Sequence, residues 1–318
     1  MIFNIFIILV GVAFLILGAE LVVRSASNIA KKFYIPEILI GLTIVSIGTS
    51  IPELIITIKS AFKGSTDLIL GNAIGSNLCN LLLILGIMGL IKPIYIQEET
   101  KKFHIPIAFF ATIFLLIISI LKENRVINSF LGVILIILFI AYIIYPILLD
   151  KKRIAKEYKK AKENKDINNR NIFFQLFIIL LGLILLKQGG DLVVNRATII
   201  AENYGLSERV IGLTIVAIGT ALPELITSIV STISNNTDIG IGNLIGSSMV
   251  NFFLILGIGA TIVPIKISEK FIENLFLLTF ANILIWSFCY IPKKNIITRI
   301  KAFSLVGIFA IYLINLLI

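Results

Sequence analysis

Charged side chains are scarce in this chain: 14% of its 318 residues are Asp, Glu, Lys or Arg, whereas 58% are hydrophobic. A soluble domain of this length needs more charge to cover its surface, so the composition argues against an ordinary globular enzyme. Histidine occurs once and cysteine twice, which disfavours a zinc, copper or iron site and a disulfide framework. The chain also lacks a Walker or other nucleotide-binding motif, which disfavours an ATP-driven pump.

What the chain has in quantity is long apolar runs. Each run is about 18–25 residues long, enough to cross the roughly 30 Å hydrocarbon core of a bilayer as a helix. The sequence therefore predicts an all-α polytopic membrane protein, whose first span is retained because the N-terminus lacks a basic region and a cleavage site. The ten predicted transmembrane helices are residues 3–26, 37–58, 67–91, 103–121, 127–149, 172–196, 208–231, 238–262, 270–290 and 300–318.

Basic residues divide unevenly between alternate loops, with nineteen Lys and Arg on one side of the predicted membrane and eight on the other. Because basic loops stay in the cytoplasm, this bias predicts a multi-pass plasma-membrane protein with both termini outside. Nine of the nineteen lie in the stretch 150–171, which we interpret as a solvated cytoplasmic linker. A regulatory or lipid-binding role for this linker stays open. The net charge of +10 thus sets topology, and no nucleic-acid partner is expected.

The two halves of the chain repeat each other. Thirteen of sixteen positions match between IGLTIVSIGTSIPELI at 40–55 and IGLTIVAIGTALPELI at 211–226, at an offset of 171. The same offset aligns LGNAIGS at 70–76 with IGNLIGS at 241–247. Because each half has five predicted spans, the second half must enter the membrane from the opposite side, as in many secondary transporters. We therefore predict two inverted five-helix repeats, at 1–149 and 172–318, joined by the linker at 150–171.

Each repeat carries a glutamate directly after a proline inside an apolar span, Glu53 and Glu224. A charged side chain near the bilayer centre costs several kcal/mol, so it points to a functional site. Equivalent carboxylates from antiparallel repeats are expected to meet at the midplane, where a divalent cation would offset their repulsion. Each proline should interrupt its helix. Backbone carbonyls released near Thr49 and Thr220 then suit a hard cation such as Ca²⁺.

Neutral polar residues in the third and eighth spans add further oxygen atoms. Ser76 and Asn80 are four residues apart and share a helical face, as do Ser247 and Asn251. Their hydroxyl and amide oxygens are suitable ligands for a monovalent cation such as Na⁺.

Other polar residues of the spans carry a weaker functional signal. Asn72 and Asn243 could serve the same site or only hydrogen-bond between helices, and both interpretations stay open. Lys187 and Asp191 are one helical turn apart and are expected to form a structural salt bridge.

The duplicated motifs, G-T-[S/A]-x-P-E followed by G-N-x-x-G-S, resemble the α-repeats of the cation/calcium exchanger superfamily, especially its archaeal and bacterial sodium/calcium exchangers. This resemblance covers essentially the whole chain. It implies a secondary active antiporter rather than an enzyme, which exchanges Na⁺ for Ca²⁺ by alternating access without a cofactor, the first and sixth helices sliding across the core. We expect it to work as a monomer in the lipid bilayer. The implied ion ligands are Glu53, Glu224, Thr49, Thr220, Ser46, Ser50, Ala217, Ser76, Asn80, Ser247 and Asn251.

Two positions depart from the pattern of that superfamily. Asn251 stands where an aspartate is frequent, and Ala221 stands where the analogy with Ser50 predicts a serine. Two carboxylates still balance the charge of Ca²⁺, so transport is expected to survive, but the coupling ion stays open. The alternative to Na⁺/Ca²⁺ exchange is an H⁺-coupled or K⁺-dependent Ca²⁺/cation antiporter. An intramembrane enzyme could also use paired acids, but it does not call for inverted repeats with broken helices.

Overall fold

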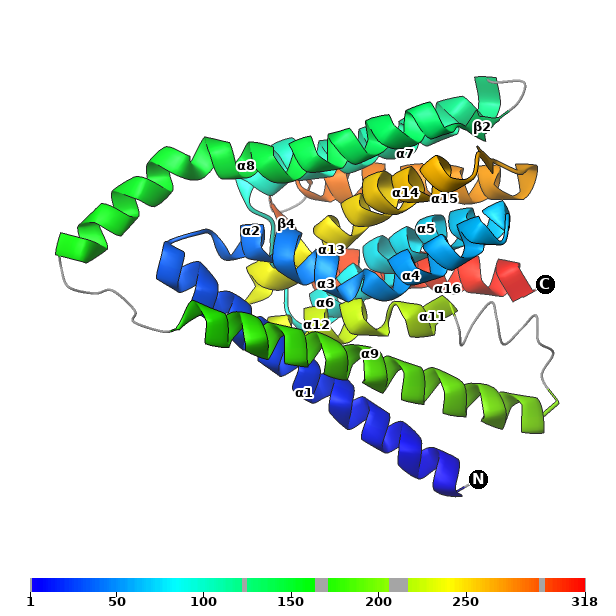
Figure 1. The fold of residues 1–318 in the computed structure, drawn as a ribbon, viewed down its shortest axis with the longest axis horizontal. Helices are drawn as coiled ribbons and strands as arrows, with labels where there is room; N and C mark the ends of the chain where they lie inside the picture. The colour runs from blue at the N-terminus through cyan, green and yellow to red at the C-terminus, as the bar shows by residue number, and fades with distance from the viewer. Residues whose placement is uncertain (1, 122–124, 164–170, 206–216, 292–294, 318) are drawn as a thin grey trace.

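The computed structural model describes residues 2–121, 125–163, 171–205, 217–291 and 295–317, most of them in helices (Figure 1). The first half contains α1 (Ile2–Phe33), α2 (Glu37–Ile40), η1 (Gly41–Val45), α3 (Ser46–Thr49), α4 (Ile51–Phe62), α5 (Thr66–Leu78), η2 (Cys79–Ile84), α6 (Leu85–Ile91), β1 (Ile94–Tyr95), η3 (Thr100–His104), α7 (Ile105–Leu121), β2 (Val126–Ile127) and α8 (Ser129–Glu163). The second half contains α9 (Ile172–Asn203), α11 (Ala217–Thr220), α12 (Leu222–Ile233), α13 (Thr237–Met249), η5 (Val250–Ile255), α14 (Leu256–Ile262), β3 (Ile265–Lys266), η6 (Glu269–Phe271), α15 (Ile272–Phe288), β4 (Ile296–Ile297) and α16 (Arg299–Leu317).

These helices occupy the predicted spans, and in the described residues six are long and apolar enough to cross a membrane. A seventh results if the bent pair Glu37–Thr49 and Ile51–Phe62 is taken as one span. The start of the seventh predicted span, at 208–216, lies outside the described residues. Helix α8 continues to Glu163, so it extends into the stretch predicted as a linker. The prediction of a helical membrane protein is confirmed.

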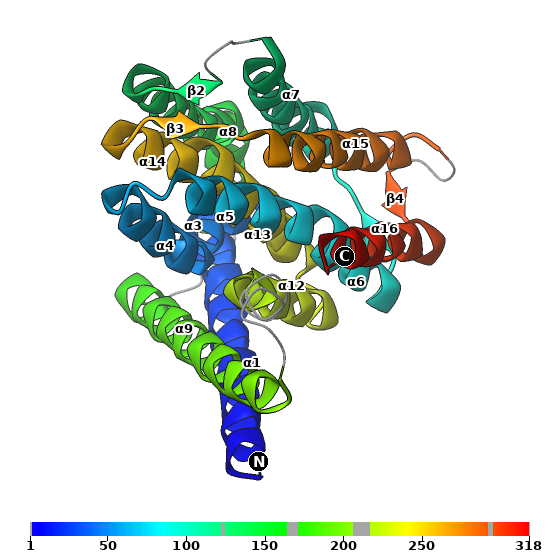
Figure 2. The same cartoon turned by 90° about the vertical axis from the view of Figure 1, so that its right-hand side faces the viewer.

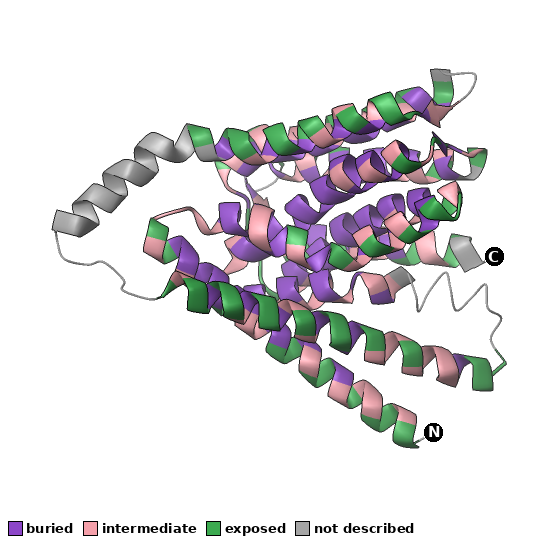
Figure 3. Cartoon of the chain, viewed as in Figure 1, coloured by how far each residue is buried: buried purple, intermediate pink, exposed green. Residues whose placement is uncertain are grey.

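The spans that carry the duplicated polar motifs lie in the middle of the molecule. In the apolar windows of Thr66–Ile91 and Thr237–Ile262, 72% and 78% of the residues are buried, against 28% in α1 and in α9. Figure 3 shows the same division, with buried residues concentrated in the central helices and exposed ones on the outer helices. Because lipid is as apolar as leucine, a central helix can be rich in Gly, Ser and Asn only if other helices shield it.

Both central spans change from α-helix to π-helix at the same relative point. The segments η2 and η5 begin at Cys79 and Val250, which are 171 residues apart in the chain. A π-helical turn shifts the hydrogen-bonding register by one residue and is common at functional sites. Each segment carries one of the predicted ligands, Asn80 or Asn251, at its second position.

Two short antiparallel strand pairs join the halves of the chain. β1 pairs with β4, aligning Ile94 with Ile297, and β2 pairs with β3, aligning Ile127 with Ile265. Figure 1 places β4 and β2 toward opposite ends of the helices, and Figure 2 shows β2 beside β3. Each half therefore contributes one strand at each end of the molecule.

Helices α1 and α9 cross on the outside of the bundle, where glycines let their backbones touch (Figure 1). A Cβ atom added to Gly18 would lie 2.6 Å from the carbonyl oxygen of Gly182, and one added to Gly182 would lie 2.7 Å from that of Gly18. Gly11 and Gly189 meet in the same reciprocal way. Since Gly11 and Gly18 stand 171 residues before Gly182 and Gly189, the contact uses equivalent positions of the two halves.

The two ends of the described chain lie toward the same side of the molecule in Figure 1. In Figure 1 the first residues of α1 and the last of α16 are on the right, whereas the end of α8 and the start of α9 are on the left. The described ends of the chain therefore lie toward one end of the molecule, and the end of α8 and the start of α9 lie toward the other.

Candidate cation site

The predicted helix interruptions are confirmed at both duplicated motifs. In the first half, α3 ends at Thr49, α4 begins at Ile51, and the helices before and after the break bend by 47°. The residue between them, Ser50, has φ −85° and ψ 8°. In the second half Ala221 takes the same place, with φ −86° and ψ 2°. The proline is the second residue of each new helix, where its missing N–H costs no intrahelical bond.

This geometry places the two glutamates in the first turns of α4 and α12. Glu53 and Glu224 are 1% and 2% exposed. The Ser50 hydroxyl donates a hydrogen bond to Glu224 Oε1 at 3.1 Å, so the second-half carboxylate reaches the break in the first half. Negative charge in the first turn of a helix is favoured by the helix dipole, which partly offsets the cost of burying these groups.

A hydrogen-bonded network fixes the break of the first half against α12 and α13. Thr49 Oγ1 donates to Asn243 Oδ1 at 3.0 Å, and Asn243 Nδ2 donates to Ser228 Oγ at 3.2 Å. Ser247 Oγ lies 3.5 Å from Thr49 Oγ1 and 3.5 Å from the backbone oxygen of Ser46. The network therefore connects three helical segments of the two halves around one point.

Both asparagines left open by the sequence form contacts between helices. Asn72, the counterpart of Asn243, donates through Nδ2 to the backbone oxygen of Glu53 at 3.0 Å and to Thr57 Oγ1 at 3.2 Å. The structure thus favours hydrogen bonding between helices as the role of both residues. For Asn243 this bonding also holds Thr49, one of the predicted ligands.

The remaining predicted ligands lie in the same region, on described segments. The Ser46 hydroxyl donates a hydrogen bond to the carbonyl of Leu42 at 2.7 Å. A Cβ atom added to Gly246 would lie 2.5 Å from Ser46 Oγ, so α3 packs closely on α13. Ser76 is buried on α5. Ala217 is the first residue of α11, and Thr220 is its last.

Several buried oxygen atoms have no hydrogen-bond partner in the described part of the chain. Among them are Glu53 Oε2, Glu224 Oε2, Asn80 Oδ1 and Asn251 Oδ1. Segment η5 contacts α4, and η2 contacts α12, so each asparagine segment packs against the glutamate helix of the other half. A buried polar atom without a partner costs free energy, which makes such atoms candidate cation ligands. An all-oxygen set fits a hard cation such as Ca²⁺, and no group of three or more His, Cys, Asp or Glu gathers in the described residues.

The structure adds residues that are outside the predicted set of ion ligands. Ser228 and Asn243 complete the network around Thr49. Asn77 is fully buried and accepts a hydrogen bond from Asn251. The available signal for Asn77 was its spacing, because it precedes Asn80 by three residues and so shares a helical face with it.

Other ionisable residues of the spans lie away from these oxygens. Lys187 Nζ and Asp191 Oδ2 are 2.7 Å apart and both side chains are about half exposed, which confirms the predicted salt bridge. Glu20 pairs with Arg24 on the outward part of α1.

Known proteins are similar to this sequence over nearly the whole chain. The model of the family described as sodium/calcium exchanger protein matches residues 3–148 and 174–318. A putative antiporter, CaxA of Alkalimonas amylolytica, is 33% identical over 258 residues, which cover 81% of this chain and 80% of that protein. The sodium/calcium exchanger MaX1 of Methanosarcina acetivorans is 31% identical over 302 residues, covering 84% of this chain and 85% of its own.

A solved structure shows the same similarity in three dimensions. The sodium-calcium exchanger NCX_Mj, soaked with zero Na⁺ and Ca²⁺, superposes with a TM-score of 0.82 at 28% identity. The superposition covers 99% of each chain.

Proposed function

Because this chain belongs to the sodium/calcium exchanger protein family, we propose that it exchanges Na⁺ for Ca²⁺ across the plasma membrane as a secondary antiporter. The observation that carries this proposal is that Glu53 and Glu224 are both buried in helices that begin at equivalent breaks, and that Ser50, at the break before Glu53, donates a hydrogen bond to Glu224. Two carboxylates neutralise one divalent ion. Without a cation their mutual repulsion is unrelieved.

In this proposal Ca²⁺ binds between the two carboxylates. The backbone oxygens of Thr49 and Thr220, which end the helices before the breaks, complete its ligands. Ca²⁺ takes 6–8 oxygen ligands in flexible geometry, so a site assembled from side chains and backbone of two halves suits it. No cofactor is required, because the ion gradient supplies the free energy.

Na⁺ binds to an overlapping set of oxygen atoms. The hydroxyl and amide groups available are those of Ser46, Ser50, Ser76, Asn80, Ser247 and Asn251, together with the backbone oxygen of Ala217. The carboxylates are shared with Ca²⁺, so the two ions exclude each other. Such competition at one site is what couples the two fluxes in an antiporter.

Alternating access follows from two inverted repeats around a central site. The reciprocal strand pairs and the reciprocal glycine contacts between equivalent positions support this architecture. Helices α1 and α9, packed closely on each other, would slide as one unit across the core. We place both termini outside and the α8–α9 connection in the cytoplasm. The protein works as a monomer in the bilayer, because each chain carries both halves of the site.

The coupling ion has a second candidate. With Asn251 the site has one carboxylate fewer than the superfamily pattern, and with Ala221 it has one hydroxyl fewer. Because both groups could bind Na⁺, the second candidate is Ca²⁺ exchange coupled to H⁺ or K⁺.

The decisive experiment measures radioactive Ca²⁺ uptake into proteoliposomes that contain the purified protein. Vesicles are loaded with Na⁺, with K⁺, or with an impermeant cation and an acidic interior. We expect uptake that depends on internal Na⁺ and is independent of the pH gradient. Uptake that follows the pH gradient and ignores internal Na⁺ would assign the protein to the H⁺-coupled class instead.

A further inference from the structure

Asn77 forms a hydrogen bond with the side-chain amide of Asn251, one of the predicted ion ligands. It is 0% exposed, and its Oδ1 accepts a hydrogen bond of 3.4 Å from Nδ2 of Asn251. This contact joins α5 of the first half to η5 of the second. It engages the nitrogen of the Asn251 amide and leaves Asn251 Oδ1 without a partner among the described residues.

The orientation of an amide decides whether it attracts or repels a cation. Its carbonyl oxygen is an acceptor, whereas its NH₂ group presents two donors. An aspartate at position 251 would present an oxygen whichever way it rotated. An asparagine can present either its oxygen or its NH₂ group, and a hydrogen bond that engages the nitrogen favours the orientation in which the oxygen is free for the ion.

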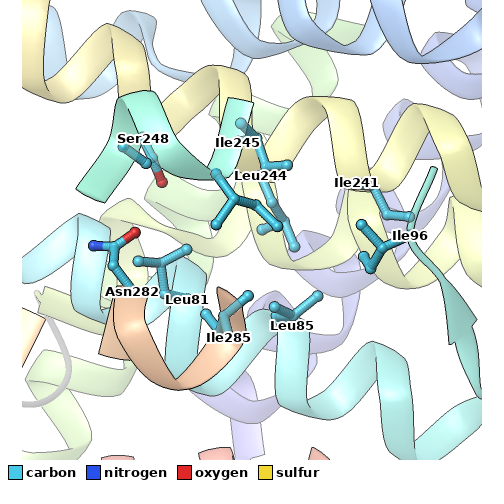
Figure 4. A pocket seen from close by; sticks show the side chains of 11 residues that line it. Leu81, Leu85, Ile96, Ile241, Leu244, Ile245, Ser248, Asn282 and Ile285 are labelled. Atoms are coloured by element: carbon cyan, nitrogen blue, oxygen red, sulfur yellow. The ribbon is translucent and has the colours of Figure 1, made fainter. Parts of the chain in front are cut away.

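The equivalent contact is not made in the other half. Ser248 stands 171 residues after Asn77, as Asn251 does after Asn80. Within the described residues, neither the Ser248 hydroxyl nor the Asn80 amide has a hydrogen-bond partner. Ser248 lines a cavity of about 30 Å³ with Leu81 and Asn282 (Figure 4). The shorter serine side chain thus leaves Asn80 unconstrained where asparagine constrains Asn251.

We propose that Asn77 is a positioning residue that turns the oxygen of Asn251 toward the transported Na⁺ and so makes the two halves of the site unequal. This inference rests on the proposed function, in that it takes Asn251 as a Na⁺ ligand. In this inference, Asn77 orients the neutral amide of Asn251 so that it can bind the ion at a position where superfamily members often carry a carboxylate. Ca²⁺, held by the two glutamates, does not depend on this contact.

Two reciprocal substitutions test the inference. Asn77→Ser removes the acceptor and should raise the Na⁺ concentration for half-saturation roughly 3- to 10-fold, the range expected for one neutral hydrogen bond. Ser248→Asn supplies the missing amide, with the adjoining cavity as space for it, and should lower that concentration by constraining Asn80. Asn77→Asp keeps an acceptor for Asn251 Nδ2 and should retain or strengthen Na⁺ binding. The two neutral substitutions, Asn77→Ser and Ser248→Asn, should leave Ca²⁺ half-saturation within about twofold of wild type.

Binding is measured at equilibrium, from the rise in melting temperature of the purified protein with Na⁺ or with Ca²⁺. This measurement does not require transport. A wild-type protein that binds both ions but is not driven by Na⁺ would refute the proposed function and leave this inference standing. An Asn77→Ser protein that folds and binds Na⁺ as wild type does, or that loses Na⁺ and Ca²⁺ affinity equally, would overturn the inference. So would a wild-type melting temperature that does not respond to Na⁺.

Discussion

Glu53 and Glu224 illustrate how a single side chain is made tolerable inside a membrane protein. Each lies in the first turn of a helix, with one carboxylate oxygen unpartnered in the described residues. For Glu224 the other oxygen accepts a hydrogen bond from Ser50. A buried carboxylate that lacks a full set of partners is costly, and a bound cation supplies what the protein leaves out. In the proposed function, these two glutamates therefore lower the stability of the ion-free protein and raise its affinity for the cation.

We expect Glu53→Gln and Glu224→Gln each to reduce Ca²⁺ flux by about 100-fold or more. Removing one partner of a buried charge interaction costs about 3–5 kcal/mol, and each 1.4 kcal/mol is about tenfold. Flux is measured by radioactive Ca²⁺ uptake into proteoliposomes at matched protein density. Glu273→Gln, an exposed glutamate at the start of α15, is the control and should transport normally. Wild-type flux in either site variant would remove that residue from the site.

At the scale of helices, the broken helices that carry the glutamates differ from the long outer helices α1 and α9. The broken helices α3–α4 and α11–α12 carry the glutamates, and their breaks are held by side-chain hydrogen bonds such as that from Thr49 to Asn243. Helices α1 and α9 contribute a smooth backbone contact on the outside of the bundle. Because α1 and α9 pack closely on each other, the proposed sliding motion would move them as one body.

We predict that Gly18→Ala separates α1 from α9 and destabilises the protein by about 1–3 kcal/mol, the usual cost of overpacking. The added Cβ would meet the backbone oxygen of Gly182 at 2.6 Å, and backbone cannot yield as a side chain does. The measurement is the melting temperature in detergent. Gly71→Ala is the matched control, because its Cβ would meet only the Phe271 ring at 3.7 Å, an ordinary contact. Since alanine favours helix by about 1 kcal/mol over glycine, the control should melt no lower than wild type, and an equal loss in both variants would contradict the close-contact explanation.

At the scale of the whole molecule, the strand pairs and glycine contacts between the halves occur in sets of two that the 171-residue repeat relates to each other. β1 pairs with β4 at one end and β2 with β3 at the other, and the glycine contacts of α1 and α9 are reciprocal.

Outside the span region the charged residues Glu98, Lys101 and Lys102 flank the β1–β4 end. The pKa of Glu98 is lowered, first by a hydrogen bond from Asn295 and then by the two lysines. The Glu98 carboxylate is therefore ionised at neutral pH. Its contacts with Asn295, Lys101 and Lys102 weaken only when the pH falls through that lowered pKa.

An inverted repeat predicts that equivalent connections face opposite sides of the membrane. Lys63, after α4, and Ser234, after α12, are both exposed and stand 171 residues apart. With a membrane-impermeant thiol reagent on intact cells, Lys63→Cys should be labelled from outside, and Ser234→Cys only after the membrane is opened. The native Cys79 and Cys289 are buried, so the wild-type protein serves as the unlabelled control. Labelling of both variants from the same side would rule out the inverted arrangement.

Much of the site was predictable because membrane burial makes polar residues conspicuous. Against long runs of Ile and Leu, the glutamates, the prolines and the asparagines of the duplicated motifs mark a functional region without any coordinates. The breaks after Thr49 and Thr220 also followed from local chemistry, since a proline three residues on lacks the N–H that would continue the old helix and its ring clashes with the preceding turn.

The sequence by itself determined the helical membrane class, the repeat and the place of the helix breaks, because hydropathy and proline act over a few residues along the chain. Only the tertiary structure decided which side chains meet across the halves: Ser50 with Glu224, Thr49 with Asn243, and Asn77 with Asn251. Partners such as these are separated by 174 or more residues and depend on helix rotation, on the π-helical register shift and on glycine-set distances between backbones. No spacing rule within one helix can fix those quantities, since each results from the packing of all the helices together.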